Sequence, residues 1–212
     1  MENTQHITGT GDDIKLYPTS AFAVMLMIFG NLIPLIGVVF WGWTVTSVLV
    51  LYWIETVIIG IMNVPRILAT GSGLKTRVFI ALFFIVHFGG FCYGHAFFLK
   101  EAFNATPVFD SLFDFQNELS PLLISAIAFF ISHLFGLIIS FFGPVKYRDR
   151  EPNVQVFMPY GRIFIMQFVV LIGGGFVQIL GAPIAALIIL ILLKTGLDWV
   201  GLRLSEKYTL LL

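Results

Sequence analysis

The sequence predicts an all-α integral membrane protein, a bundle of six transmembrane helices with the N- and C-termini cytoplasmic. Of its 212 residues, 58% are apolar and only 11% are charged, and the mean hydropathy of +0.95 is far above that of a soluble domain. The apolar residues form six runs, each near the roughly 20 residues that cross a hydrocarbon core. Nine of the 12 Lys and Arg residues lie in connections that this topology makes cytoplasmic, and only Lys100 lies in an outer one.

The whole chain, residues 1–212, is expected to form one integral membrane domain. The polar segment 1–18 is expected to be a retained cytoplasmic tail, because it lacks the basic region and short apolar core of a secretory signal. The predicted helices lie near residues 20–41, 44–66, 77–99, 120–142, 159–181 and 183–204. The first two and the last two of these are joined so tightly that each pair must form an antiparallel hairpin.

The longest outer connection, residues 100–119, is expected to contain a short amphipathic helix on the membrane surface. Phe109 and Leu112 share one face of that helix, and Asp110 lies to one side. The acidic residues of this loop outnumber Lys100, so it either concentrates cations at an entrance or is an ordinary solvated loop.

The expected partner is the lipid bilayer, and the sequence does not indicate any protein partner. The formal net charge of zero gives no basic field for nucleic acid, and the single Cys92 excludes an internal disulfide. The sequence contains no phosphate-binding Gly-rich loop and no nucleophile elbow, so no motif assigns an enzyme class. Whether the protein is an enzyme stays open.

Ionisable side chains inside the predicted helices are the candidate functional residues. Each costs about 2.5 to 3.5 kcal/mol at the bilayer centre and therefore needs a partner. At about 1.5 Å per residue, four of them on four helices lie at a similar depth, roughly 10 to 15 Å from the cytoplasmic edge. They are Glu55, His87, His133 and Lys194. A second layer nearer the cytoplasm is expected to be a structural polar cluster. Its members are Asn63, Arg66, Arg162 and Asp198.

Glu55, His87 and His133 are expected to be the ligands of a metal ion. His87 lies on one stripe with Gly90 and Gly94, a small-residue spacing that would let its helix approach the helix of His133 closely. Imidazole and carboxylate ligands suit Zn²⁺ or Fe²⁺, and three protein ligands leave a position open for a reactive water. The favoured hypothesis is therefore a membrane-embedded metal-binding protein, with hydrolysis of a lipid-like substrate as one possible activity.

His95 cannot share an ion with His87, because eight residues of one helix separate them by about 12 Å. Cys92 and His95 lie three residues apart on one face and form a weak second candidate site. A small buried apolar role for Cys92 is the favoured interpretation.

Two questions stay open from the residues alone. Lys194 can pair with Glu55, or with Asp198 four residues further along its own helix. The polar layer also fits two rival functions, a proton- or cation-coupled transporter and a non-catalytic assembly or scaffold protein.

Several stretches together resemble a family of bacterial polytopic membrane proteins catalogued as a domain of unknown function. The stretches are Tyr52-Trp53-Ile54-Glu55, His87-Phe88 through His95, Ser132-His133, Pro159-Tyr160-Gly161-Arg162-Ile163 and Leu193-Lys194-Thr195-Gly196-Leu197-Asp198. The resemblance implies a multi-pass protein of the bacterial cell (inner) membrane with a single integral domain. It implies no activity, substrate or cofactor.

Overall fold

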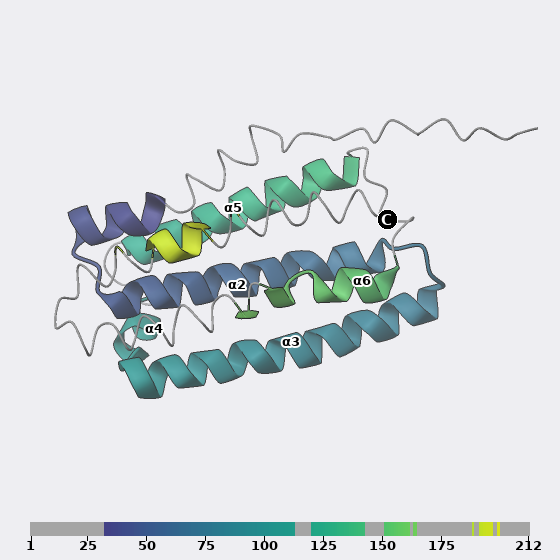
Figure 1. The fold of residues 1–212 in the computed structure, drawn as a ribbon, viewed down its shortest axis with the longest axis horizontal. Coiled ribbons are helices and arrows are strands. Elements are labelled where there is room, and N and C mark those ends of the chain that lie inside the picture. Colours follow the sequence, from purple (N-terminus) through teal and green to yellow (C-terminus); the bar gives the residue numbers. More distant parts are fainter. Residues whose placement is uncertain are drawn as a thin grey trace, which may run out of the picture.

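A computed structural model describes most of the chain between residues 32 and 199. The described residues are 32–112, 120–142, 151–161, 163–164, 188, 191–196 and 199. All regular secondary structure within these ranges is helical, which confirms the predicted all-α class. Figure 1 shows that the long helices run side by side along the longest axis of the molecule.

Helix α2 (Val45–Leu68) is the centre of the described bundle. It contacts α3 (Leu74–Phe103), α4 (Thr106–Leu112), α5 (Pro121–Phe142) and α6 (Pro152–Phe157). Four consecutive residues, Val48 to Leu51, have no exposed surface, so α2 is enclosed on all sides at this level. A helix enclosed in this way can carry a polar side chain at membrane depth without exposing it to lipid.

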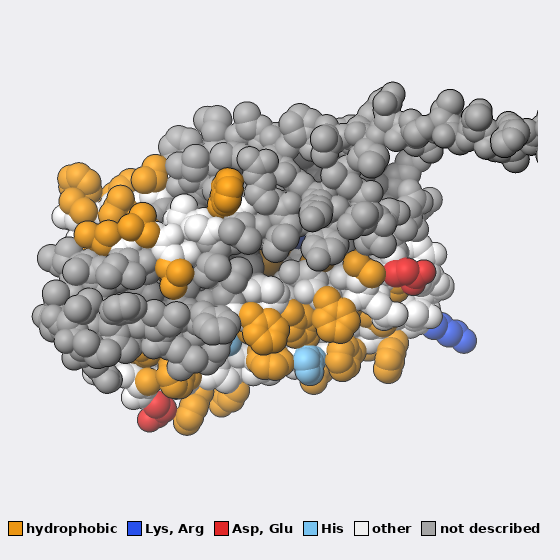
Figure 2. Space-filling view, in the orientation of Figure 1, with side chains coloured by type: hydrophobic (Ala, Val, Ile, Leu, Met, Phe, Trp, Pro, Cys, Tyr) orange, Lys and Arg blue, Asp and Glu red, His pale blue; other side chains and the backbone are white. Residues whose placement is uncertain are grey.

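Three described helices, α2, α3 and α5, are long and apolar enough to cross a membrane. Figure 2 shows hydrophobic side chains over the middle of the described surface in that view, with the visible acidic and basic groups near its two ends. This distribution is typical of a membrane protein. The count of six spans and the cytoplasmic location of both termini stay predictions.

The long helices lie close to the predicted apolar runs, but α3 is longer than expected. It extends beyond the predicted range 77–99 at both ends and has 30 residues. Lys75 and Lys100 lie in these extensions, and because Lys is a good helix former the helix continues past its apolar section. At its end, Asn104 adopts the left-handed conformation (φ 49°) typical of a residue that terminates a helix.

Short-range contacts explain how the chain turns into and out of α2. Gly42 has a positive φ of 63°, which favours glycine, and Thr44 accepts a hydrogen bond from the backbone N–H of Ser47 at the start of the helix. At the other end, the Arg77 guanidinium donates to the carbonyl of Leu68 at 2.7 Å. This bond satisfies a carbonyl that the end of α2 leaves without a helical partner.

Helix α6 corrects the sequence prediction for the connection before residue 159. That connection was expected to be a cytoplasmic loop, but it contains a helix that begins with Pro152 in the first turn and packs against both α2 and α3 (Figure 1). Proline is favoured in the first turn because its missing N–H has no helical partner there. The regular helix ends at Phe157, and Met158, the residue before Pro159, still has helical backbone angles (φ −52°, ψ −44°).

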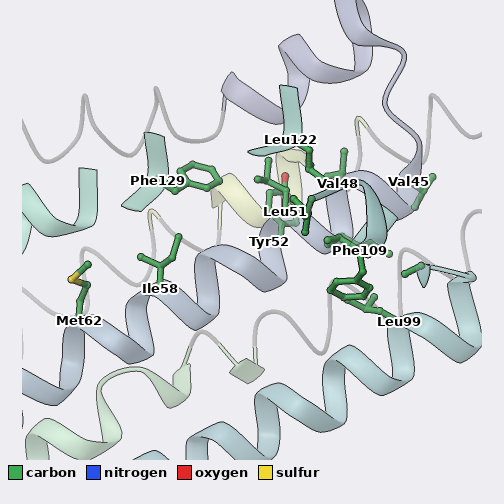
Figure 3. Packing of buried hydrophobic residues seen from close by; sticks show 14 of the residues in the cluster. Val45, Val48, Leu51, Tyr52, Ile58, Met62, Leu99, Phe109, Leu122 and Phe129 are labelled. Atoms are coloured by element: carbon green, nitrogen blue, oxygen red, sulfur yellow. The ribbon is translucent and has the colours of Figure 1, made fainter. Parts of the chain in front are cut away.

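The main hydrophobic core lies around the first half of α2. Figure 3 shows Leu122 of α5 and Leu99 of α3 on opposite sides of this helix, with Phe109 of α4 near Leu99. The Phe109 ring also meets the Trp53 ring edge to face at 5.3 Å. The core therefore holds α2 rigidly on both sides of the turn that carries Glu55.

Candidate functional site

Glu55 is a buried carboxylic acid in the middle of α2, with 6% of its surface exposed. It occupies this place because the apolar sequence around it forms a continuous helix and α3, α5 and α6 cover that helix. Tyr52 precedes it by one turn on the same face and is 1% exposed. Burial of a carboxylate at this depth requires a charged or hydrogen-bonding partner.

Lys194 supplies that partner from the helical segment 191–196. Its Nζ lies 2.9 Å from Oε2 of Glu55, and both side chains are more than nine-tenths buried. The same ammonium lies 4.7 Å from the centroid of the Tyr52 ring, a cation–π distance. Of the two partners that the sequence left open for Lys194, the structure contains the contact with Glu55. Asp198 lies outside the described residues.

His133 on α5 approaches the other oxygen of the carboxylate. Its Nε2 lies 3.6 Å from Oε1 of Glu55, and 27% of its side chain is exposed compared with 8% for Glu55. The imidazole therefore lies between the buried carboxylate and the surface of the bundle. We call Tyr52, Glu55, His133 and Lys194 the Glu55 cluster. It joins α2, α5 and the segment 191–196 around one buried carboxylate.

His87 does not join this cluster. It lies on an exposed face of α3, where its Nδ1 is 2.6 Å from the hydroxyl of Tyr160 and its ring stacks on Phe83 at 5.2 Å. Phe91 meets the imidazole edge to face, also at 5.2 Å. The pair between His87 and Tyr160 thus ties α3 to the segment that follows α6.

The expected convergence of Glu55, His87 and His133 is not found in the described part of the chain. No group of three His, Cys, Asp or Glu side chains there lies close enough to hold a metal ion. The structure brings together Glu55 and His133 but joins His87 to Tyr160 instead. Binding of Zn²⁺ or Fe²⁺ stays a prediction from the sequence.

The predicted glycine-lined contact along α3 is not found among the described residues. A Cβ placed on Gly90 or Gly94 would meet nothing within 4 Å among the described residues, so neither glycine lies in a close helix contact there. The close approach is at Gly60 of α2 instead, where a Cβ would lie 2.3 Å from Cε1 of Phe88. The large Phe88 ring fills the gap that Gly60 leaves, and this fit decides which face of α3 turns inward.

Cys92 lies on this inward face of α3, is 7% exposed and carries a free thiol. Its backbone carbonyl accepts a hydrogen bond of 2.8 Å from the indole N–H of Trp53. His95, three residues further on, is half-buried. Cys92 therefore has a packing role in the contact between α2 and α3, and the candidate second site at Cys92 and His95 acquires no third ligand among the described residues.

Asn63, a member of the predicted second polar layer, has a partner that was not predicted from the sequence. Asn63 and Gln155 are both buried, and the Gln155 side-chain amide donates to Oδ1 of Asn63 at 2.7 Å while the Asn63 side-chain amide donates to the backbone carbonyl of Gln155 at 3.1 Å. Arg66 lies one turn further along α2 and is half-buried, and Arg162 and Asp198 lie outside the described residues. Gln155 was missed because its segment was interpreted as a loop.

The chain matches the family of unknown function DUF6498 over residues 15–210. The chain belongs to this family. The match covers nearly the whole chain, including every residue of the Glu55 cluster. Neither a curated protein nor a solved structure matches the chain at a significant level.

Proposed function

We propose that this DUF6498 protein is a multi-pass transporter of a bacterial inner membrane, in which the Glu55 cluster is a cation-exchange centre. The observation that carries the proposal is the carboxylate of Glu55 between an ammonium and an imidazole, on the buried face of a helix apolar enough to cross a membrane. Ionisable groups are expensive at this depth, and where they occur they often belong to ion pathways or proton relays.

The two oxygens of Glu55 have neighbours suited to different steps of an exchange. Lys194 neutralises Oε2 as a cation that is part of the protein, and the more exposed His133 lies beside Oε1. A proton or cation that arrives past His133 competes with the Lys194 ammonium for the same carboxylate. Since Glu55 and Lys194 come from different helices, this competition is coupled to the distance between those helices.

The proposal includes six membrane spans with both termini in the cytoplasm. Arg66, Lys75 and Arg77 lie at or near the turn between α2 and α3, whereas the opposite end of α3 has Lys100 as its basic residue. An excess of basic residues favours the cytoplasmic side, so this asymmetry supports a cytoplasmic location for that turn.

Metal binding at the same place is a second candidate function. Glu55 and His133 offer an oxygen and a nitrogen ligand 3.6 Å apart, but an ion that binds both must compete with the Lys194 ammonium for the carboxylate. The scaffold alternative gives the cluster no role beyond holding α2, α5 and the segment 191–196 together.

Flux through proteoliposomes tests the proposed function. Purified protein is reconstituted with a pH-sensitive dye inside, and gradients of K⁺, Na⁺ or ammonium are applied in turn. We expect at least one gradient to drive a change of internal pH with the wild type beyond that of protein-free liposomes, which neutral ammonia crosses unaided, and Glu55→Gln to abolish this excess when flux is expressed per folded protein. Glu101→Gln, which removes an exposed carboxylate at the end of α3, is the matched control and should retain the flux. Equal flux with Glu55→Gln, or no flux with the wild type under any gradient, contradicts the proposal.

A further inference from the structure

The Glu55 cluster contains the two groups that proteins combine to recognise an organic ammonium ion. The Lys194 Nζ lies 2.9 Å from Oε2 of Glu55 and 4.7 Å from the centroid of the Tyr52 ring. A carboxylate supplies a charge-assisted hydrogen bond, and an aromatic face attracts a cation that has been removed from water. The ammonium of Lys194 thus occupies a place that has the chemistry of a ligand site.

The Tyr52 ring and the Glu55 carboxylate, the groups that contact the ammonium, are held in position by contacts that do not involve Lys194. Tyr52 and Glu55 lie one turn apart on the same face of α2, and this part of α2 is packed against α3, α4 and α5. His133 reaches the carboxylate from α5. Lys194 comes from a separate helical segment, and its long stem allows the ammonium to move without displacing the carboxylate or the ring.

We propose that Tyr52, Glu55 and His133 form a binding site for a small primary ammonium ion, and that Lys194 is the built-in ligand of this site. This inference rests on the proposed function, because it names the class of cation that the exchange centre accepts. A primary alkylammonium or the ammonium ion itself takes the position of the Lys194 Nζ, donates to Oε2 of Glu55 and lies over the Tyr52 ring. The Lys194 side chain and the incoming ion exclude each other.

Chemical rescue of Lys194→Ala tests this site. The substitution removes three methylene groups and the ammonium, which are the atoms of propylammonium. We expect purified full-length Lys194→Ala to unfold at a lower temperature than the wild type, and propylammonium to raise that temperature with saturation. Propanol, which has the same heavy-atom skeleton without the charge, should not raise it. In Lys194→Ala/Glu55→Gln, propylammonium should also have no effect.

The Tyr52 ring provides an independent measurement. Tyr52→Leu in the Lys194→Ala background should weaken the apparent affinity for propylammonium by roughly 2- to 30-fold, the range expected for loss of one cation–π contact. If Lys194→Ala does not fold alone, the amine is added throughout extraction and purification, and recovery of monodisperse protein becomes the measurement. Recovery by propylammonium and not by propanol supports the site. No rescue, or equal rescue by both compounds, overturns it.

The outcomes also separate this inference from the transport proposal. Rescue by propylammonium without any flux through the wild type supports the ammonium site and contradicts transport. Flux that depends on Glu55 without rescue of Lys194→Ala supports transport and overturns the ammonium site.

Discussion

The carboxylate of Glu55 and the ammonium of Lys194 lie 2.9 Å apart although they come from distant parts of the chain. Both are buried, so each is the partner that makes the other tolerable at membrane depth.

Removing only one of the two charges should be more harmful than removing both. Lys194→Met leaves the Glu55 carboxylate buried without its ammonium and should lower the free energy of unfolding by about 3 to 5 kcal/mol. Glu55→Gln/Lys194→Met should be less destabilised than Lys194→Met alone. Denaturant unfolding in detergent micelles, followed by tryptophan fluorescence, measures both. Lys75→Met, at an exposed position, is the control, and additive losses in the double variant would contradict the coupling.

The metal content of the protein should depend on Lys194. We expect less than one zinc or iron per chain in the wild type, because the ammonium already neutralises the carboxylate. Lys194→Met should bind added Zn²⁺ more tightly, since it removes the competing charge, and Lys194→Met/His133→Ala should lose that gain. Elemental analysis of purified protein and zinc titration check this. Stoichiometric metal in the wild type that is lost in both Glu55→Ala and His87→Ala would favour the three-ligand hypothesis instead.

The hydroxyl of Tyr160 should stabilise the protein through His87 without any effect on the Glu55 cluster. Tyr160→Phe removes the group that lies 2.6 Å from Nδ1 of His87 and should cost about 1 kcal/mol of stability. His87→Phe/Tyr160→Phe should be close to neutral, because both polar groups are then replaced by apolar ones. Thermal unfolding measures the cost. Proteoliposome flux should be unchanged in the double variant, and a loss of flux would mean that His87 belongs to the functional centre.

The close contact between α2 and α3 should make Gly60 sensitive to even one added methyl group. Gly60→Ala places its Cβ 2.3 Å from the ring of Phe88, which is 4% exposed and stacked against Phe84, so the ring has little room to move. We expect a loss of about 1 to 3 kcal/mol in stability. Gly94→Ala adds a methyl group to α3 where no described atom lies within 4 Å, and it should be neutral or stabilising.

A comparison of the two alanine variants in one thermal unfolding experiment therefore checks the orientation of α3. Equal effects of Gly60→Ala and Gly94→Ala would contradict the packing of Phe88 against Gly60.

The layer that contains Glu55, His133 and Lys194 was predictable because depth follows directly from residue count in a helix. The rotation of α3 was not, because this helix is apolar on all sides and its hydrophobic pattern has no preferred face. Phe79, Val86 and Phe97 are exposed, while Phe84 and Phe88 of the same apolar sequence are buried. The sequence therefore predicted the correct helix for His87 but not its neighbours Tyr160 and Phe83.

Helix α6 and its contact with Asn63 could not be inferred for a different reason. A segment of six residues that begins with proline resembles a loop, since short helices have weak periodic patterns. Its helical form depends on burial of Gln155 and Val156 against the rest of the bundle. Tertiary contacts, which cannot be inferred from the local sequence, stabilise the helical form of α6.

The 30 residues of α3 give it a length of about 45 Å, while the hydrocarbon core of a bilayer is about 30 Å thick. Its charged residues lie near the two ends, with Lys75 and Arg77 at one and Lys100 and Glu101 at the other. In the proposed topology these ends lie among the headgroups of both leaflets, so a thinner bilayer would be met by tilting of α3 or by local thickening of the lipid. Because α3 packs along α2, a tilt of α3 would also tilt the helix that carries Glu55. The length of the lipid chains would then affect the geometry of the ion pair between Glu55 and Lys194.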